Sequence, residues 1–211
     1  MRTAYLMGLP GSGKTTLINK WKEAGGLTVP EFLEEVPPYV VNAWSGGAEE
    51  RREAQRWVVD QHRMKNSVIE SYSHDNKDRL VLVDRCPIEA VFYSSVFDQE
   101  TASYTLGELA RTNWSVGFFI WITTDLDVLH RRIVNERGRD ESEWQDQWLP
   151  LSTALLPWYK KLSDEFGVKT YESPTASRDS ISIDKLAEFI DVNYRDFDLN
   201  SVVNFFAKAI Q

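Results

Sequence analysis

A glycine-rich stretch close to the N-terminus has the residue types and spacing needed to hold a phosphate. Residues 8–15 read GLPGSGKT, a complete match to the pattern G-x-x-x-x-G-K-[ST]. Glycines allow backbone angles that other residues avoid, so the N–H groups of such a loop can converge on one anion. The candidate nucleotide-binding residues are Gly8, Pro10, Gly11, Ser12, Gly13, Lys14, Thr15 and Thr16.

Two side chains of this loop have expected roles with a nucleoside triphosphate. Lys14 should neutralise the β- and γ-phosphates, and Thr15 should ligate Mg²⁺. The helix expected over residues 14–23 points its positive end at the same place. We therefore expect ATP and Mg²⁺ as cofactors. The loop by itself leaves open whether the phosphate goes to water, to a protein or to a small acceptor.

An acidic residue and an arginine end an apolar run over residues 80–84, which read LVLVD. Asp84 stands where an acid that holds Mg²⁺ and its waters is expected. It can also cap the next helix, which Pro87 would begin, and the two roles are compatible. Arg85 can clamp a phosphate acceptor or steady the transferring group. Cys86 is predicted to be a packed residue, because phosphoryl transfer needs no thiol nucleophile.

Four arginines fall within nine residues of a chain that is otherwise acidic, in the stretch HRRIVNERGRDE at residues 130–141. Gly138 breaks the helical pattern, which indicates a mobile segment. Such a segment, at about 131–143, can close over a triphosphate and supply charge through Arg132, Arg137 and Arg139. The alternative is a solvated helix face paired with neighbouring acids.

Apolar runs and helix-period stretches alternate along the chain, which predicts an α/β protein of the three-layer P-loop NTPase type. Its parallel sheet would carry helices on both faces, and ligands would collect at the carboxyl ends of the strands. The predicted strands are residues 3–7, 80–84, 117–123 and 168–171. The predicted helices are residues 14–23, 49–74, 87–96, 106–113, 125–136, 144–166, 182–192 and 199–210.

Length and composition favour one domain over residues 1–211, with a C-terminal helical addition at about 182–211. The chain is 42% hydrophobic and has a single cysteine and a net charge of −8. One cysteine fits a reducing cytoplasm, and no apolar run is long enough to span a bilayer. The acidic balance disfavours binding of long nucleic acid. A homodimer is possible, because dimers are the commonest assembly of soluble enzymes.

Five segments, taken in order and spacing, resemble the deoxynucleoside kinase and thymidylate kinase group of P-loop kinases. The resemblance covers roughly residues 2–172, and its more specific parts are Asp84-Arg85 and the arginine-rich stretch. The segments are GLPGSGKTT, EFLEEVPPYVVNAW, AQRWVVDQHRMKNS, VDRCPIEAVFYSSVF and IWITTDLDVLHRRIVNERGRDES.

The resemblance implies further site residues. In this group an acid after the second strand acts as general base on the acceptor hydroxyl, and Glu34 or Glu35 matches that position better than Glu31. The base-reading glutamine of the group looks like Gln55 or Gln61. Arg85 matches the arginine on the acceptor side. The aromatic partners of a bound ring are Trp44, Trp57, Phe92 or Tyr93.

The leading hypothesis is an ATP-dependent phosphotransferase acting on a small nucleoside or nucleoside monophosphate of the (deoxy)pyrimidine type. The Asp-Arg pair is closer to the nucleotide kinases than to nucleoside kinases with Glu-Arg-Ser, so both acceptors stay open. The alternatives are a kinase acting on a nucleic-acid base or end, or on a non-nucleotide metabolite hydroxyl. A switch GTPase is disfavoured, because the nearest match to Asn-Lys-x-Asp, at residues 76–79, precedes the Asp84 strand.

Overall fold

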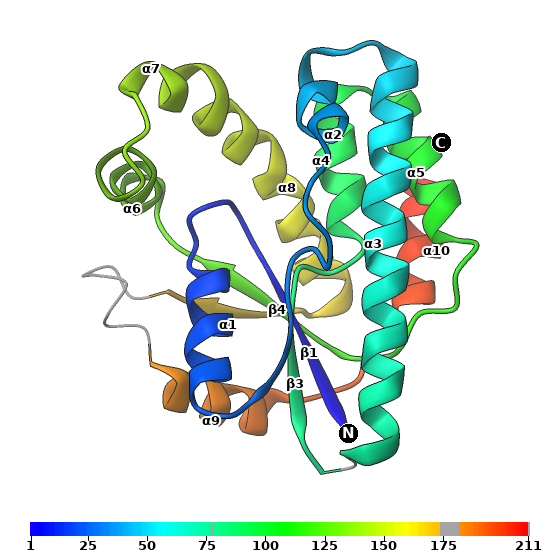
Figure 1. Cartoon of the computed structure of the whole chain (residues 1–211), viewed down its shortest axis with the longest axis vertical. Helices are drawn as coiled ribbons and strands as arrows, with labels where there is room; N and C mark the ends of the chain where they lie inside the picture. The colour runs from blue at the N-terminus through cyan, green and yellow to red at the C-terminus, as the bar shows by residue number, and fades with distance from the viewer. Residues whose placement is uncertain (77, 174–181, 211) are drawn as a thin grey trace.

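A five-stranded parallel sheet forms the centre of the protein. The computed structural model describes residues 1–76, 78–173 and 182–210 (Figure 1). The strands lie in the order β2-β3-β1-β4-β5, so β1 has β3 and β4 as its neighbours. Their bounds are β1 Arg2–Met7, β2 Leu27–Val29, β3 Leu80–Asp84, β4 Phe118–Thr123 and β5 Lys169–Glu172.

Helices connect the strands and cover both faces of the sheet. The helices before β4 are α1 Lys14–Glu23, α2 Pro38–Asn42, the 3₁₀ turn η1 Ala43–Ser45, α3 Ala48–Asp75, α4 Glu89–Phe97 and α5 Gln99–Leu109. Those after β4 are α6 Leu126–Arg131, the π-helical η2 Arg132–Glu136, α7 Glu141–Glu143, the π-helical η3 Trp144–Trp148, α8 Leu149–Phe166, α9 Ile183–Asn193 and α10 Leu199–Ile210.

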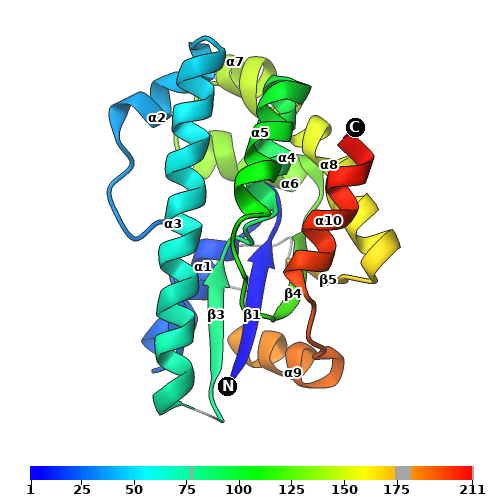
Figure 2. The same ribbon diagram turned by 90° about the vertical axis from the view of Figure 1, so that its right-hand side faces the viewer.

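The three-layer α/β fold expected from the alternating pattern is confirmed. Helices α1 and α9 lie on one side of the sheet, and α3, α5 and α10 lie on the other (Figure 1). Figure 2 is turned toward this second side and shows α3, α5 and α10 running along it. Because both faces are covered, the strand β3 is buried along its whole length, as its continuous apolar run predicts.

The structure differs from the sequence prediction where elements are short or polar. Strand β2 was not predicted, because its three residues are too few to show a period and two of them are only partly buried. Helix α5 begins at Gln99 rather than at residue 106, because the Asp98 carboxylate caps it by accepting from the Thr101 N–H at 2.6 Å. The predicted helices 125–136 and 144–166 both contain a π-helical segment.

The C-terminal helix α10 packs its apolar face into the core. Leu199, Val202, Val203 and Phe206 are buried, and the Phe206 ring lies 5.4 Å from that of Phe92. This packing accounts for the apolar stripe of the helix. Within the described part of the chain, no helix is both long and apolar enough to cross a bilayer.

Candidate active site

A cavity of about 1260 Å³ opens where the phosphate loop meets the carboxyl end of β3. Its walls are the phosphate loop, the segments after β2 and β3, residues 131–143 and the start of α8. Residues 131–143 are called the arginine segment below. This is the edge at which ligands of parallel sheets bind. The lining residues used below are Lys14, Thr15, Glu31, Arg85, Tyr93, Arg137, Arg139, Glu143, Asp146, Gln147 and Trp148.

The phosphate loop has the backbone that the glycine pattern predicts. Gly8 has φ of 144°, and a Cβ there would lie 2.3 Å from the Ile122 carbonyl oxygen. The Lys14 ammonium donates to the carbonyls of Gly8 and Leu9, at 2.8 and 3.0 Å. Burial, aided by the charge of Arg85, lowers the pKa of Lys14 to about 8. The loop thus holds a buried cation at the position expected for phosphate contact.

The residues at the loop's end fit a magnesium ion bound beside phosphates. The Thr15 hydroxyl donates to Asp84 Oδ2 at 3.0 Å. Asp84 is buried, and its Oδ1 has no hydrogen-bond partner among the residues that the structure describes. A hydroxyl and an unsatisfied carboxylate oxygen are ligands that Mg²⁺ accepts when phosphates and waters complete its shell. Thr15 and Asp84 are the residues that would hold the ion, and this role stays a prediction.

Arg85 lines the cavity in an unusual backbone conformation. Its φ of 73° is the one positive value at a non-glycine position in the described ranges, and such geometry costs of order 1–3 kcal/mol. Its Nε donates to Glu31 Oε1 at 2.7 Å, and Nη1 donates to the Tyr93 hydroxyl at 2.7 Å. Its guanidinium also lies 4.9 Å from the Tyr93 ring centre. These contacts hold the arginine in place despite the strain.

Of the three candidate acids after β2, Glu31 lines the cavity and Glu34 and Glu35 do not, which corrects the leading prediction. Burial by itself would raise the pKa of Glu31, but Arg85 and Lys14 hold that pKa below its ordinary value. Glu34 and Glu35 are exposed and lie farther along the loop. The Glu34 carboxylate accepts from the Gln61 amide at 2.8 Å instead.

The predicted ring-binding residues of α3 do not line the cavity. Gln61 is 1% exposed, and its Oε1 accepts from the N–H groups of Leu33 and Glu34 at 3.0 and 3.2 Å. It supports the loop after β2. The Trp57 ring lies 5.1 Å from that of Phe32. Gln55 is also buried on α3 and is absent from the lining. Trp44 is in η1, but its side chain lies outside the described residues.

Phe92 is a core residue, which corrects its predicted role with substrate. It is fully buried, and its ring lies 5.6, 5.5 and 5.4 Å from those of Trp158, Tyr159 and Phe206. The next residue, Tyr93, lines the cavity instead. Successive helical residues point in different directions, and the packing of α8 and α10 decides which one turns inward.

Phe92→Ala is therefore expected to destabilise the fold by about 3–5 kcal/mol, because it leaves a cavity among aromatic rings. Phe92→Leu, which keeps most of the volume, should retain the wild-type KM for the acceptor. Denaturant unfolding and initial-rate kinetics measure the two quantities. A raised acceptor KM in a stably folded Phe92→Leu variant would return Phe92 to the substrate site.

The three predicted arginines of the arginine segment divide into two groups. Arg132 is 1% exposed, and its Nη1 donates to the Gly11 carbonyl at 3.0 Å and to Ser173 Oγ at 3.3 Å. It supports the phosphate loop from behind, which corrects its predicted place in the cavity. Arg137 and Arg139 do line the cavity. Arg139 also forms an ion pair of 3.4 Å with Glu143, which lines the cavity too.

Arg137→Ala and Arg139→Ala are each expected to lower kcat by roughly 10²-fold, because each removes a positive charge from the cavity that the phosphate loop lines. The matched control is Arg131→Ala, an exposed residue of the same segment that does not line the cavity. Steady-state kinetics with saturating substrates measure the change. An unchanged kcat in both variants would make the segment a solvated helix face.

Three buried polar residues of the site were not predicted: Lys65, Glu89 and Tyr159. The Lys65 ammonium donates to the carbonyls of Asp84 and Glu31, at 2.5 and 3.3 Å, and burial lowers its pKa to about 8. It joins the end of β3 to the loop after β2. The hydrophobic periodicity of α3 could not reveal Lys65, because the buried face of this helix also carries the polar residues Gln61 and His62.

The fold and the site define a P-loop nucleotide-binding domain. The family model for an AAA domain matches residues 3–170, and the chain belongs to this family. No curated protein matches the sequence.

Two solved structures share the fold, as the resemblance to P-loop kinases predicts. Deoxyadenosine kinase from M. mycoides, with its products dCMP and a flexible dCDP bound, has a TM-score of 0.60 at 17% identity. That alignment covers 89% of this chain and 96% of the kinase. Thymidylate kinase from Candida albicans has a TM-score of 0.65 at 15% identity, over 91% of this chain and 92% of that one.

Proposed function

We propose that this protein is an ATP-dependent phosphotransferase that moves the γ-phosphate to a hydroxyl of a small nucleoside-type acceptor. One observation carries the proposal: Glu31, paired with Arg85, lines the same cavity as Lys14 of the phosphate loop. A carboxylate and a phosphate-binding lysine in one cavity are what transfer to a hydroxyl requires.

Each side chain has a defined part in this reaction. ATP would supply the phosphoryl group, and Mg²⁺ held by Thr15 and Asp84 would offset the charge of its phosphates. Glu31 is held in its ionised form and accepts the proton of the acceptor hydroxyl. Arg85 fixes the Glu31 carboxylate. Closure of the arginine segment would exclude water and bring positive charge to the transferring group.

The charges of the site favour a hydroxyl acceptor over a phosphate acceptor. A phosphate monoester needs arginine donors that are not already neutralised. Arg85 is already paired with Glu31 at 2.7 Å and with Glu89 at 3.4 Å. The names of the structural neighbours, deoxyadenosine kinase and thymidylate kinase, support the nucleoside and nucleotide class. The (deoxy)pyrimidine preference stays a prediction.

Transfer from γ-labelled ATP to separate deoxynucleosides, ribonucleosides, their monophosphates and an oligonucleotide tests the proposal. The expected result is label on a nucleoside, with Lys14→Ala as the control of strongly lowered activity. Label on a monophosphate alone would exclude the hydroxyl role of Glu31. Label on the oligonucleotide, or release of phosphate to water without an acceptor, would overturn the nucleoside assignment.

A cytoplasmic location and a homodimer are further parts of the proposal. Cys86 is the single cysteine of the sequence, and a chain that cannot form an internal disulfide is suited to a reducing compartment. Cell fractionation and light scattering on the purified protein measure location and subunit number.

A further inference from the structure

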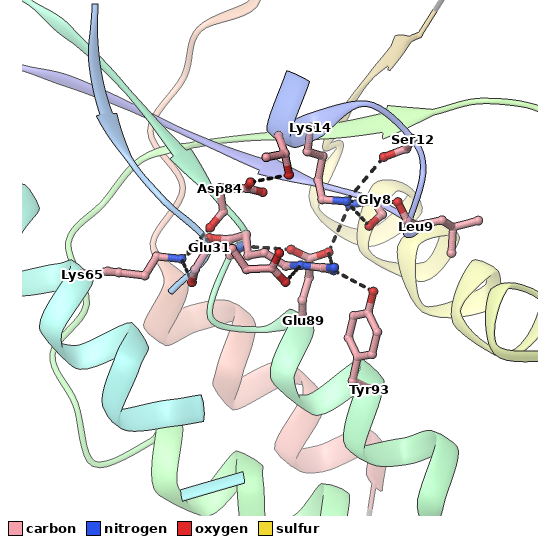
Figure 3. A network of polar contacts seen from close by, with 12 residues as sticks. Gly8, Leu9, Ser12, Lys14, Glu31, Lys65, Asp84, Glu89 and Tyr93 are labelled. Carbon is pink, nitrogen blue, oxygen red and sulfur yellow. Dashed lines mark hydrogen bonds and ion pairs between the residues drawn. The ribbon is translucent and has the colours of Figure 1, made fainter. Parts of the chain in front are cut away.

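Glu89 is a buried carboxylate in the first turn of α4 that contacts three separate parts of the site. Its Oε1 accepts from the Gly8 N–H at 3.1 Å and from the Tyr159 hydroxyl at 2.5 Å. Its Oε2 accepts from the Cys86 N–H at 3.0 Å. The Arg85 guanidinium completes the set, 3.4 Å from Oε1. Figure 3 shows Glu89 between the phosphate loop and Tyr93.

All four contacts of Glu89 are donors, which makes the carboxylate hard to replace. The side chain is 1% exposed. A buried carboxylate is costly unless its oxygens are hydrogen-bonded, and here both are. The two N–H groups and the hydroxyl would in turn lose their partner without it. The local geometry therefore depends on an acceptor with two oxygens at this point.

The contact with Gly8 reaches the donor side of the cavity. The N–H of Gly8 is bound by Glu89, and the carbonyl of Gly8 accepts from the Lys14 ammonium at 2.8 Å. Gly8 is the residue at which the chain leaves β1 and enters the phosphate loop. The contact with Arg85 reaches the acceptor side, where that arginine meets Glu31.

The contact with Tyr159 reaches the wall that carries the arginine segment. Tyr159 is buried on α8, and its ring lies 5.8 Å from that of Trp121 on β4, with an interplanar angle of 13°. Helix α8 begins directly after η3. The residues of η3 that line the cavity are Asp146, Gln147 and Trp148.

We propose that Glu89 is a positioning residue that holds the phosphate loop, Arg85 and α8 in one geometry and thereby aligns the phosphate donor with the acceptor. The effect of Glu89 on phosphate transfer rests on the proposed function. The effect of Glu89 on nucleotide binding does not rest on it, because that effect acts through the contact with Gly8.

Glu89→Gln is the main test, because it keeps the shape and removes one acceptor oxygen. Its amide NH₂ must face either the Cys86 N–H or the donors on Gly8 and Tyr159, so one side of the junction opens. We expect the Kd for MgATP, measured by calorimetry, to rise roughly tenfold and kcat to fall roughly 10–100-fold, since small displacements are costly in aligned sites.

Tyr159→Phe tests the same link without placing a new group beside the carboxylate. It should raise the Kd for MgATP about threefold. The change in Glu89→Gln/Tyr159→Phe should be smaller than the product of the two single changes, because both substitutions act on the same junction. The matched control is Tyr194→Phe, which also loses a hydroxyl, one that donates to Asp196 at 2.8 Å and accepts from the Thr3 N–H at 3.3 Å, near the start of β1 and away from the phosphate loop. It should leave both the Kd and kcat unchanged.

The outcomes separate this proposal from the proposed function. Wild-type protein that binds MgATP but phosphorylates no acceptor would refute the function, while the Kd values would still decide the role of Glu89. If Glu89→Gln does not fold, Tyr159→Phe against Tyr194→Phe decides. The positioning role would be overturned if folded Glu89→Gln or folded Tyr159→Phe bound MgATP with the wild-type Kd. It would also be overturned if the changes in Kd from the two substitutions multiplied in the double variant.

Discussion

Lys14→Ala is expected to lower kcat by roughly 10²–10³-fold while the protein remains folded, because the variant loses the one charge-assisted donor of the phosphate loop aimed at the transferring group. We expect the fold to tolerate the loss of this charge, although the carbonyls of Gly8 and Leu9 lose a donor. Lys14 is buried, and burial lowers its pKa, so the ammonium is held in the folded protein at a cost. Initial rates and a thermal unfolding curve give the two readouts.

The control for Lys14→Ala lies on the same helix. Lys22→Ala removes an exposed lysine from the last turn of α1 that does not line the cavity, so it should retain the wild-type kcat. An unfolded Lys14→Ala protein would show that the lysine is structural. A folded one that turns over at the wild-type rate would remove the phosphate loop from the mechanism.

Glu31→Gln is expected to lower kcat by roughly 10²–10⁴-fold, the range that a positioned general base contributes. The amide keeps the size of the side chain but cannot accept the proton of the acceptor hydroxyl. It also loses the charge that pairs with Arg85 at 2.7 Å. The Kd for MgATP should change little, because no described contact joins Glu31 to the phosphate loop backbone. Single-turnover kinetics and calorimetry separate the two effects.

Glu34→Gln and Glu35→Gln are the matched controls, since both acids lie in the same loop and are exposed. Both variants should transfer phosphate at nearly the wild-type rate. Glu34→Gln loses the charge beside Gln61, so a small decrease in stability is its expected effect. A large loss of kcat in either variant, with Glu31→Gln active, would restore the position that the sequence resemblance favoured.

Local patterns were sufficient for the phosphate loop and for four of the five strands of the sheet. The roles of Gly8, Gly13 and Lys14 follow from backbone freedom and charge over a few consecutive residues, and the structure forms the loop as that pattern predicts. Strand β3 is a continuous apolar run because both faces of the sheet are covered. Such features depend on neighbours in the sequence, so the sequence reports them directly.

Tertiary packing decided which side chains reach the cavity. Glu31 and Glu34 are three residues apart with the same chemistry, and contacts with the distant Arg85 and Gln61 separate their roles. Phe92 and Tyr93 are adjacent, and the rings of α8 and α10 bury the first while the second faces the cavity.

Arg132 and Glu89 show the same limit for charged residues. Arg132 reads as part of a charged run, but the Gly11 carbonyl, far away in sequence, draws it behind the phosphate loop. Glu89 reads as an ordinary acid in the first turn of a helix. Its partners on Gly8 and Tyr159 lie 81 and 70 residues away. Side-chain direction in a folded site is set by contacts between distant segments, so it is determined only when the chain has packed.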